Sequence, residues 1–437
     1  MARTDLPTGT RIVGVYYATS ALFTLATSII WGVNTLFLLG AGLSLFEVMV
    51  VNAVFSAGQL VFEVPTGVVA DTLGRKVSYL IGIASLFGST LLYVAAARYE
   101  WGFAGFAIAS VLLGFGYTCQ TGAVDAWLID ALDHVEYDKP REQVFARAGM
   151  LGGIAMLTGT LAGGFIGQVN LSLPYIVRSV ILLAAFALVL VAMREIGFEP
   201  RPLKASRFAE ETRTIARAGA TYGWNNPVVR PLLFVSAAQG AFMMFFFYSS
   251  QPFALQLLGR SDLVWVAGAL TALFGATGVV GNALVGRAMK SKLGADPTRL
   301  LAWCAAATAG LTVAIALVGL MAPAAGDIRS FAAMVVIMMM FGIVFGVAGP
   351  VRQAFINRQI PTAQRATVLS IDAFFRDAGA MTGQPALGWL ATRTSIPLGY
   401  LVGSLLLGAA APLYRMAGRG SRDPQDAAKA RDADLLV

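Results

Sequence analysis

The chain has 437 residues, of which 57% are hydrophobic and 13% are charged, and its formal net charge is +8. Soluble domains carry about 25% charged residues, so a chain this apolar has too few polar side chains to cover a water-exposed surface. The composition excludes an ordinary soluble protein and predicts an all-α membrane protein. The basic residues gather in alternate loops, as membrane topology requires, so the positive charge does not indicate a nucleic-acid partner.

Apolar runs long enough to cross a bilayer, about 20 residues each, recur along the whole chain. Twelve transmembrane helices are predicted, six in each half of the chain. They cover residues 12–39, 44–66, 77–97, 103–131, 142–168, 173–193, 229–257, 263–287, 299–322, 330–356, 365–391 and 396–416. The pattern divides the chain into an N-terminal half, a cytoplasmic linker, a C-terminal half and a cytoplasmic tail, at residues 1–193, 194–228, 229–416 and 417–437.

The linker and the loops indicate how the chain lies across the membrane. Apolar residues recur at helical spacing within residues 204–222, so we expect an amphipathic helix on the membrane surface there. An even number of spans places both termini on one side, and all but six of the 32 basic residues lie on that side. The six are Arg98, Arg178, Arg260, Arg329, Arg376 and Arg393. By the positive-inside rule both termini are cytoplasmic, and we expect the plasma (inner) membrane.

A short polar stretch, GVVADTLGRK, follows the second predicted span at residues 67–76. Its glycines permit a tight turn, and its opposite charges can latch two helix ends at the membrane surface. The stretch resembles the loop signature of the major facilitator superfamily, Gly-x-x-x-Asp-(Arg/Lys)-x-Gly-(Arg/Lys)-(Arg/Lys), which joins the second and third of twelve helices. The matching residues are Gly67, Asp71, Gly74, Arg75 and Lys76.

This resemblance implies two pseudo-symmetric six-helix bundles that work by alternating access. It also implies that Asp130, at the cytoplasmic end of the fourth span, is an acidic partner of the loop arginine. We expect Asp71, Arg75 and Asp130 to form a cluster that holds the cytoplasmic side shut and separates as the halves rock. Glu63, just before the signature, is expected to belong to this gate and not to bind substrate.

An internal repeat supports the two-bundle interpretation. At an offset of 224 residues, the fifth span aligns with the eleventh without gaps, and Gly159 pairs with Gly383. Small residues recur in the fifth span, where they let helix backbones approach closely. Residues 155–164 also resemble the antiporter signature Gly-x-x-x-Gly-Pro-x-x-Gly-Gly.

Ionisable residues inside a span cost about 2.5–3.5 kcal/mol each on insertion scales, so each one needs a reason. The eleventh span has three: Asp372, Arg376 and Asp377. Asp372 and Arg376 are four residues apart and can pair on one helix face. Two interpretations stay open, a structural ion pair and a proton or cation relay, and Asp125 on the fourth span is a further candidate for proton coupling.

The family resemblance implies a central cavity lined by the first, fourth, seventh and tenth spans. Their polar candidates for substrate contact are Asn34, Tyr117, Gln120, Gln239, Tyr248 and Gln251. Apolar runs start nearby at Phe242 (FMMFFFY) and Met338 (MMMF). Methionine and aromatic side chains repack easily, so the lining suits hydrophobic or amphipathic molecules and has too few hydrogen-bonding groups for a sugar site.

The sequence therefore predicts a secondary active transporter, with proton-coupled export of a hydrophobic or amphipathic small molecule as the first interpretation. Uptake or facilitated diffusion of a small organic solute, or movement of a lipid-like substrate, is the alternative. A membrane enzyme or a sensor on this scaffold is disfavoured, because the chain has one histidine, two cysteines within apolar runs and no metal-ligand spacing. We expect no cofactor and no metal, membrane lipid around the spans, protons as coupling ions and a monomer.

Overall fold

The computed structural model describes residues 8–198, 217, 219–322, 325–360 and 365–420, and in these ranges the regular structure is entirely helical. The chain divides into two compact units. Unit 1 comprises Met1–Leu43, Val54–Ala209 and Asp262–Ala272, and unit 2 comprises Ser44–Ala53, Glu210–Ser261 and Leu273–Val437. Most of the expected linker helix and all of residues 421–437 lie outside the described residues.

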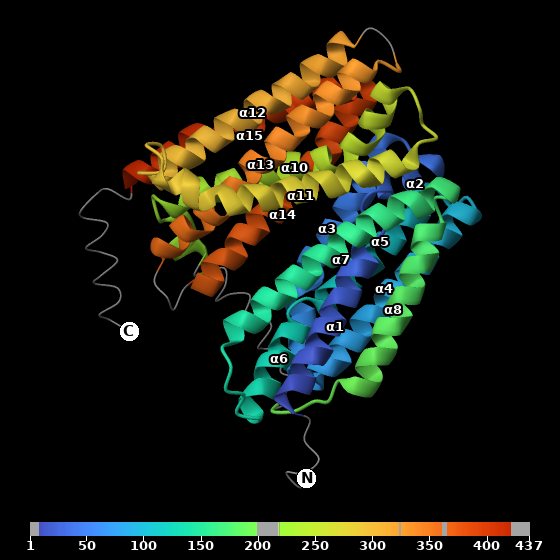
Figure 1. The fold of residues 1–437 in the computed structure, drawn as a ribbon, viewed down its shortest axis with the longest axis vertical. Coiled ribbons are helices and arrows are strands. Elements are labelled where there is room, and N and C mark those ends of the chain that lie inside the picture. The colour runs from blue at the N-terminus through green and yellow to red at the C-terminus, as the bar shows by residue number, and fades with distance from the viewer. Residues whose placement is uncertain (1–7, 199–216, 218, 323–324, 361–364, 421–437) are drawn as a thin grey trace. The chain divides into compact units, whose positions relative to one another are not determined.

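Unit 1 is built mainly from the helices of the first half of the chain, coloured blue to green in Figure 1. They are α1 (Gly9–Ser28), α2 (Asn34–Gly40), α3 (Leu45–Leu73), α4 (Arg75–Arg98), α5 (Gly102–Gln120), α6 (Ala123–His134), α7 (Arg141–Val169) and α8 (Leu173–Ala192). Helices of this length bond all their interior backbone groups within one segment, as a lipid environment requires.

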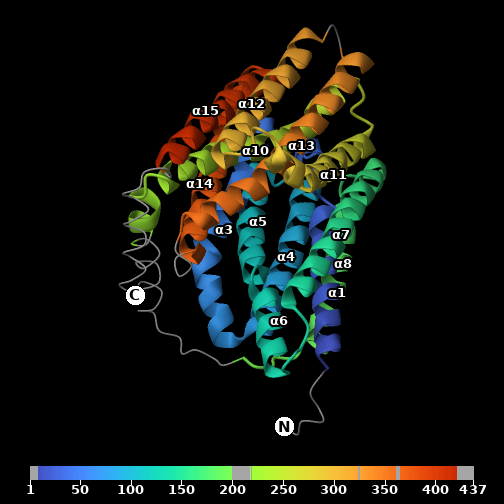
Figure 2. The ribbon, with the colours of Figure 1, turned by 60° about the vertical axis from the view of Figure 1, so that its left-hand side comes forward.

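Unit 2 is built mainly from the helices of the second half, which Figure 2 shows from another side. They are the π-helix η2 (Gly219–Trp224) and the α-helices α10 (Val229–Leu258), α11 (Val264–Lys290), α12 (Pro297–Met321), α13 (Ile328–Arg358), α14 (Arg365–Arg393) and α15 (Ile396–Gly420). Local sequence sets several of these ends. Asp296 accepts hydrogen bonds from the first backbone amides of α12, Asp327 does the same for α13, and Gly259 ends α10 in a left-handed conformation. The Ser330 hydroxyl also donates a hydrogen bond to Asp327, and this bond, together with those from the backbone amides of Arg329 and Ser330, lowers the pKa of Asp327.

Ten helical segments among the described residues are long and apolar enough to cross a membrane. They correspond to ten of the twelve predicted spans, and the protein is accordingly an integral, multi-pass membrane protein. The first and eleventh predicted spans fall short of the same criterion. The first is interrupted between α1 and α2, and the eleventh, α14, carries three charged residues near its middle. The count of twelve stays a prediction.

Two spans that were predicted as continuous helices are broken. The predicted helix 12–39 is interrupted at residues 29–33, and the predicted helix 103–131 is interrupted at Thr121 and Gly122. Just before the first break, the hydroxyls of Thr27 and Ser28 donate to carbonyls three or four residues earlier, a kind of bond that bends helices. At the second break, Gly122 has a φ of +78°, which a right-handed helix cannot contain.

The same helix pairs pack against each other within each unit. In unit 1, α1 contacts α7 and α8, and α4 contacts α5 and α8. In unit 2, α10 contacts α14 and α15, and α12 contacts α13 and α15. The two bundles therefore repeat one packing scheme, as the sequence repeat predicts.

Glycines make the closest of these helix contacts possible. A Cβ atom on Gly159 or Gly163 of α7 would collide with Ser28 or Ile29 at the end of α1. At the position that the repeat pairs with Gly159, a Cβ atom on Gly383 of α14 would collide with Ala241 of α10. The packing role predicted for small residues of the fifth span is confirmed, and the paired glycine of α14 has the same role.

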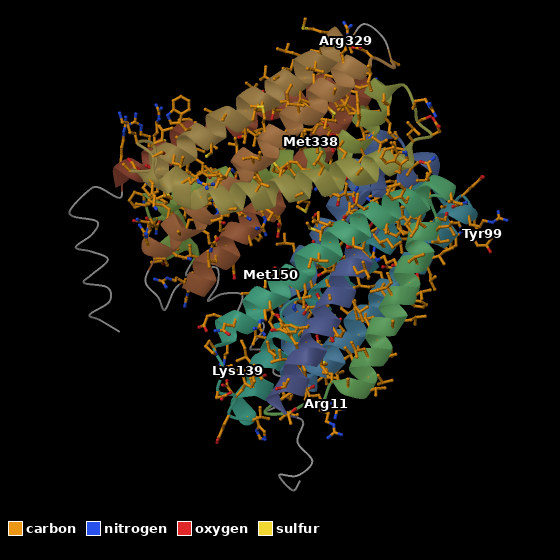
Figure 3. The ribbon with its side chains drawn as sticks, viewed as in Figure 1. Arg11, Tyr99, Lys139, Met150, Arg329 and Met338 are labelled. Carbon is orange, nitrogen blue, oxygen red and sulfur yellow. The ribbon has the colours of Figure 1, made fainter. Side chains whose placement is uncertain are left out.

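Aromatic residues mark one end of unit 1. Tyr99 and Trp101 are exposed in the turn between α4 and α5, and their rings stack with centroids 6.4 Å apart. Figure 3 shows Tyr99 at the end of this unit opposite to Arg11 and Lys139. Exposed tyrosine and tryptophan favour the boundary between lipid and water, so this turn is suited to the membrane surface.

Candidate functional site

The signature stretch 67–76 is mostly helix, which corrects the prediction of a polar turn. Residues 67–73 form the last turns of α3, α4 begins at Arg75, and Gly74 alone separates them. Gly74 has a φ of +104°, and a Cβ atom there would lie 2.7 Å from Oε2 of Glu195. The positive φ is the reason for glycine here, and a larger residue would also displace the Glu195 carboxylate.

The three charged residues expected to form the gate lie together. Nη1 of Arg75 is 2.7 Å from Oδ1 of Asp71, and Nε of Arg75 is 3.7 Å from Oδ2 of Asp130. All three side chains are largely buried, at 21–34% exposure. The predicted contacts are confirmed, and the closer one is between the end of α3 and the start of α4.

Lys76 and Glu63, the other charged gate candidates, lie nearby in sequence but differ in setting. Nζ of Lys76 donates to the backbone carbonyl of Leu190 at the end of α8, at 2.8 Å. Glu63 lies on α3 two turns before Asp71, with an exposed side chain. Lys76 therefore joins the signature to α8, whereas Glu63 belongs to the exposed face of α3.

Glu195, directly after α8, completes this cluster and was missed by the sequence analysis. Its Oε1 accepts from the backbone amide of Arg75 at 3.2 Å, and its Oε2 accepts from that of Lys76 at 2.9 Å. A carboxylate in this position satisfies free amides and the positive end of the helix dipole. Phe198 follows, with its ring centroid 5.9 Å from Cζ of Arg75. In the sequence, the one signal for this role was the position of an acidic residue, Glu195, just after the end of a predicted span.

Replacement of Glu195 by alanine should lower the free energy of unfolding by about 1 kcal/mol, because the first amides of α4 lose their acceptor. Unfolding in mixed micelles measures this change. Glu195→Gln is the matched control, since it keeps an acceptor oxygen and loses only the charge, and it should fall between wild type and Glu195→Ala. Equal stability of all three proteins would contradict the capping role.

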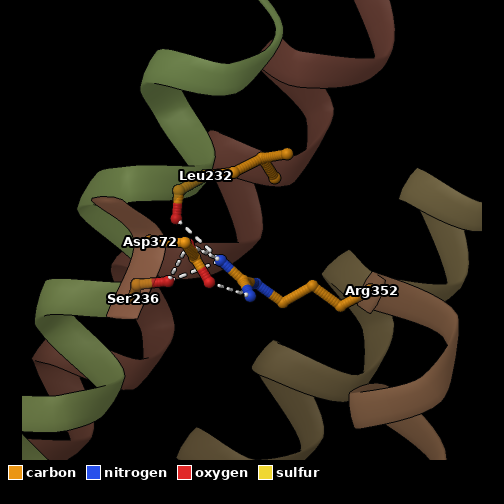
Figure 4. Close-up of polar contacts among 4 residues, drawn as sticks. All are labelled: Leu232, Ser236, Arg352 and Asp372. Atoms are coloured by element: carbon orange, nitrogen blue, oxygen red, sulfur yellow. Dashed lines mark hydrogen bonds and ion pairs between the residues drawn. The ribbon is translucent and has the colours of Figure 1, made fainter. Parts of the chain in front are cut away.

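Unit 2 contains a buried ion pair that includes Asp372, but its partner is not the Arg376 that the sequence suggested. Asp372 of α14 pairs with Arg352 of α13, with Nη1 to Oδ2 at 2.9 Å and Nη2 to Oδ1 at 2.5 Å. Figure 4 shows that Ser236 and the carbonyl of Leu232, both on α10, complete the cluster. The Ser236 hydroxyl donates to Asp372 at 2.6 Å, and Nη2 of Arg352 donates to the Leu232 carbonyl at 3.1 Å.

The expected pairing of Asp372 with Arg376 is therefore wrong. Arg376 pairs instead with its neighbour Asp377, with Nε to Oδ1 at 3.2 Å, and these side chains are 55% and 38% exposed. The Arg352 and Asp372 side chains are only 13% and 11% exposed. A bidentate pair across two helices, with further hydrogen bonds, satisfies buried charges better than a pair along one helix.

Asp125, the remaining coupling candidate, lies in the first turn of α6, directly after the break in the fourth predicted span. Its Oδ1 accepts a hydrogen bond of 2.8 Å from the hydroxyl of Tyr16 on α1. The side chain is exposed, whereas Tyr16 is buried. Asp125 thus has a neutral partner and an exposed side chain, in contrast to the enclosed charge of Asp372.

The residues of unit 2 that were predicted to line the substrate cavity differ in how deeply they are buried. Gln239 and Tyr248 are half-buried on α10, whereas Gln251 and Met338 are buried. Phe242 packs against Gly403 and Tyr400 of α15 and is fully buried in an aromatic cluster within the unit. We assign Phe242 to this core and leave it out of the substrate-contact set.

In unit 1, Asn34 and Tyr117 lie near a buried arginine, and Gln120 is half-buried at the end of α5. Asn34 accepts a hydrogen bond from the hydroxyl of Tyr175 at 2.7 Å. Tyr175 and Tyr117 are both electrostatic neighbours of Arg178 on α8. The sequence analysis placed Arg178 on the outer side of the membrane, but it is buried within the bundle, at 3% exposure.

No group of three or more histidine, cysteine, aspartate or glutamate residues that could hold a metal ion occurs within the described part of the chain. The ionisable clusters at Arg75 and Arg352 consist of carboxylates paired with arginine. Such ion pairs can separate when the helices that carry them move.

Comparisons with known proteins agree with this architecture. The profile described as "Major Facilitator Superfamily" matches residues 16–326. The "Uncharacterized MFS-type transporter YxaM" of Bacillus subtilis (strain 168) is 25% identical over 174 residues, which cover 40% of this chain and 42% of that protein's length. Two of the solved structures that are similar in fold are also transporters.

The nucleoside transporter NupG is similar with a TM-score of 0.72 and 13% sequence identity, and the match covers 95% of this chain and 99% of that chain. A D-xylose-proton symporter is similar with a TM-score of 0.65 and 14% sequence identity, and the match covers 93% of this chain and 97% of that chain. At these identities the structures show the fold alone.

Proposed function

Because the chain belongs to the Major Facilitator Superfamily, we propose that it exports hydrophobic or amphipathic small molecules in exchange for protons. Its two six-helix bundles alternate access to a substrate site. It acts as a monomer in the plasma (inner) membrane, with both termini in the cytoplasm. Uptake or facilitated diffusion of a small organic solute, or movement of a lipid-like molecule, is the alternative that the experiment below separates from export.

The observation that carries proton coupling is the buried cluster of Asp372, Arg352 and Ser236. A carboxylate enclosed in a membrane bundle stays ionised only while its positive partner is in place. Because the cluster joins α10, α13 and α14, a shift of one of these helices would separate the pair and favour protonation of Asp372. Protonation would in turn weaken the hold on Arg352, so the proton and the helix position are coupled.

Asp372 is the first choice among the three coupling candidates. Asp377 is more exposed and pairs with its sequence neighbour, so a helix shift would leave that pair intact. Asp125 is exposed and hydrogen-bonded to a phenol, so its charge needs no ion pair. Neither of these carboxylates combines burial with an interhelical partner.

The cluster of Asp71, Arg75 and Asp130 is proposed as the cytoplasmic latch, with Gly67, Gly74, Lys76 and Glu195 as its supports. The ion pair of Asp71 with Arg75 joins two helix ends at a one-residue junction. Asp130 attaches α6 to the same guanidinium. Separation of these contacts would let the helix ends move when access alternates.

The experiment is uptake into vesicles reconstituted with the purified protein, using a panel of lipophilic dyes and organic solutes with and without an imposed pH gradient. The expected result is accumulation of at least one amphipathic compound that requires the gradient and collapses with a protonophore. Accumulation that ignores the gradient would support facilitated diffusion. Chemical conversion of a labelled compound would contradict a transporter, and empty vesicles control for passive entry.

A further inference from the structure

Arg178 of α8 is the buried charge in unit 1 that the proposed transport cycle leaves unexplained. It is 3% exposed, and its Nε is a buried nitrogen without a hydrogen-bond partner. Burial of an unpaired charge in a membrane bundle is expensive, so such residues mark sites that bind something.

The contrast with Arg352 of unit 2 is informative. Arg352 has a bidentate carboxylate partner, a serine hydroxyl and a backbone carbonyl. Within the described residues, Arg178 makes no ion pair, and its electrostatic neighbours are the phenols of Tyr93, Tyr117 and Tyr175. The protein supplies the anion for one buried arginine and leaves the other without one.

The phenols around Arg178 are held in place by partners behind them. The hydroxyls of Tyr93 on α4 and Ser110 on α5 lie 2.6 Å apart. The Tyr175 hydroxyl donates to Asn34, the first residue of α2 after the break that follows α1. These bonds fix the phenols by contacts between α2, α4, α5 and α8, so the surroundings of the guanidinium are preorganised.

Aromatic rings form the apolar part of the same site. The rings of Tyr93 and Tyr175 stack with centroids 5.9 Å apart, and the ring centroids of Phe37 and Tyr175 are 4.2 Å apart. Tyr117 contacts Phe23 and Phe55 edge-on, at 5.5 and 5.7 Å. Tyr117 is half-buried, whereas Tyr93 and Tyr175 are fully buried, so Tyr117 is the least buried of the three tyrosines.

We propose that Arg178 binds the anionic group of an amphipathic substrate, with Tyr117 and the neighbouring rings against its apolar body. A guanidinium matches the planar oxygens of a carboxylate and the oxygens of a sulfonate or a phosphate monoester. The inference rests on the proposed transport function and narrows its substrate class to organic anions. Asn34 and Tyr175 are positioning residues, because they orient the phenol shell.

Binding to the full-length protein in nanodiscs of neutral lipid tests this proposal without a proton gradient. The probes are naphthoate, naphthalenemethanol and naphthylmethylammonium, which share a ring and differ in charge, and hexyl sulfonate and hexyl phosphate extend the anion set. Calorimetry should detect binding of at least one anion to wild type. Arg178→Met should weaken it by about tenfold or more, because a charge-assisted bond is lost.

Two further variants separate binding from structure. Arg178→Lys keeps the charge and should restore most of the anion affinity, whereas Arg98→Met removes an exposed arginine of the same unit and should leave it unchanged. The melting temperature of Arg178→Met should equal or exceed that of wild type, because an unpaired buried charge is removed. A lower melting temperature together with unchanged anion binding would assign Arg178 to structure alone.

Other outcomes would also overturn the proposal. If all anions bind wild type and Arg178→Met equally, or none binds wild type, there is no anion site at Arg178. Stabilisation that depends on Arg178 only when the nanodiscs contain an anionic lipid would assign the site to a lipid headgroup and overturn the substrate assignment. Failure of pH-driven uptake with intact anion binding would contradict proton coupling and leave the anion site standing.

Discussion

Asp372→Asn should reduce pH-driven accumulation in reconstituted vesicles by about tenfold or more, the largest functional effect that we expect from one substitution. The amide keeps an acceptor oxygen for Arg352 and nearly the shape of the carboxylate, but it cannot bind a proton in exchange for the arginine. Efflux down a substrate gradient, which needs no proton, should be reduced less. The ratio of the two rates is the measured quantity.

Asp377→Asn is the matched control, since it removes a carboxylate from the same helix five residues later. Its pair with Arg376 is exposed and local to α14, so its ratio of driven to downhill transport should stay close to that of wild type. An equal loss of driven transport in both variants would assign coupling to the charge of α14 as a whole. Unchanged driven transport in Asp372→Asn would make its ion pair purely structural.

Arg352→Met should lower the free energy of unfolding by about 3–5 kcal/mol, the largest effect on stability that we expect. Among the described residues, the substitution leaves the Asp372 carboxylate with the Ser236 hydroxyl as its hydrogen-bond donor, so the carboxylate loses the charge that compensates its desolvation. Unfolding of the purified protein in mixed micelles measures the loss.

The double variant Arg352→Met/Asp372→Leu should recover most of that stability, because neither buried charge remains. It should still fail to couple transport to a pH gradient. A double variant as unstable as Arg352→Met would show that the cost comes from lost packing of the arginine side chain and not from an unpaired charge. This pair of variants therefore separates the structural and the coupling interpretations of the cluster.

The two buried arginines suggest a division of roles between the bundles. In unit 2, Arg352 pairs with Asp372, which we propose takes up the coupling proton. In unit 1, Arg178 has tyrosines as its neighbours, and we propose that it takes its anion from the substrate. The shared helix pairing of the two units therefore supports two different kinds of ionic site, because only the side chains on the helices differ.

The sequence by itself determined the features that depend on composition and on neighbours along the chain. Apolar runs determined the membrane class, because lipid excludes charged residues from long helices. The signature stretch placed the charges of Asp71 and Arg75 within reach of each other, because both lie in one short polar segment between two apolar runs. Glycine in the fifth span predicted a close helix contact, and the structure shows that the partner is α1.

Only the tertiary structure decided which charges meet across helices. Asp372 has a suitable partner four residues later on its own helix, but the rotation of α14 turns it toward Arg352 on α13. Glu195 reaches α4 because α8 ends beside it, and Arg178 is buried near Tyr175 of its own helix and Tyr93 and Tyr117 of two other helices. Contacts between helices are set by their rotation and register, which hydrophobic spacing leaves undetermined in helices that are apolar on most sides.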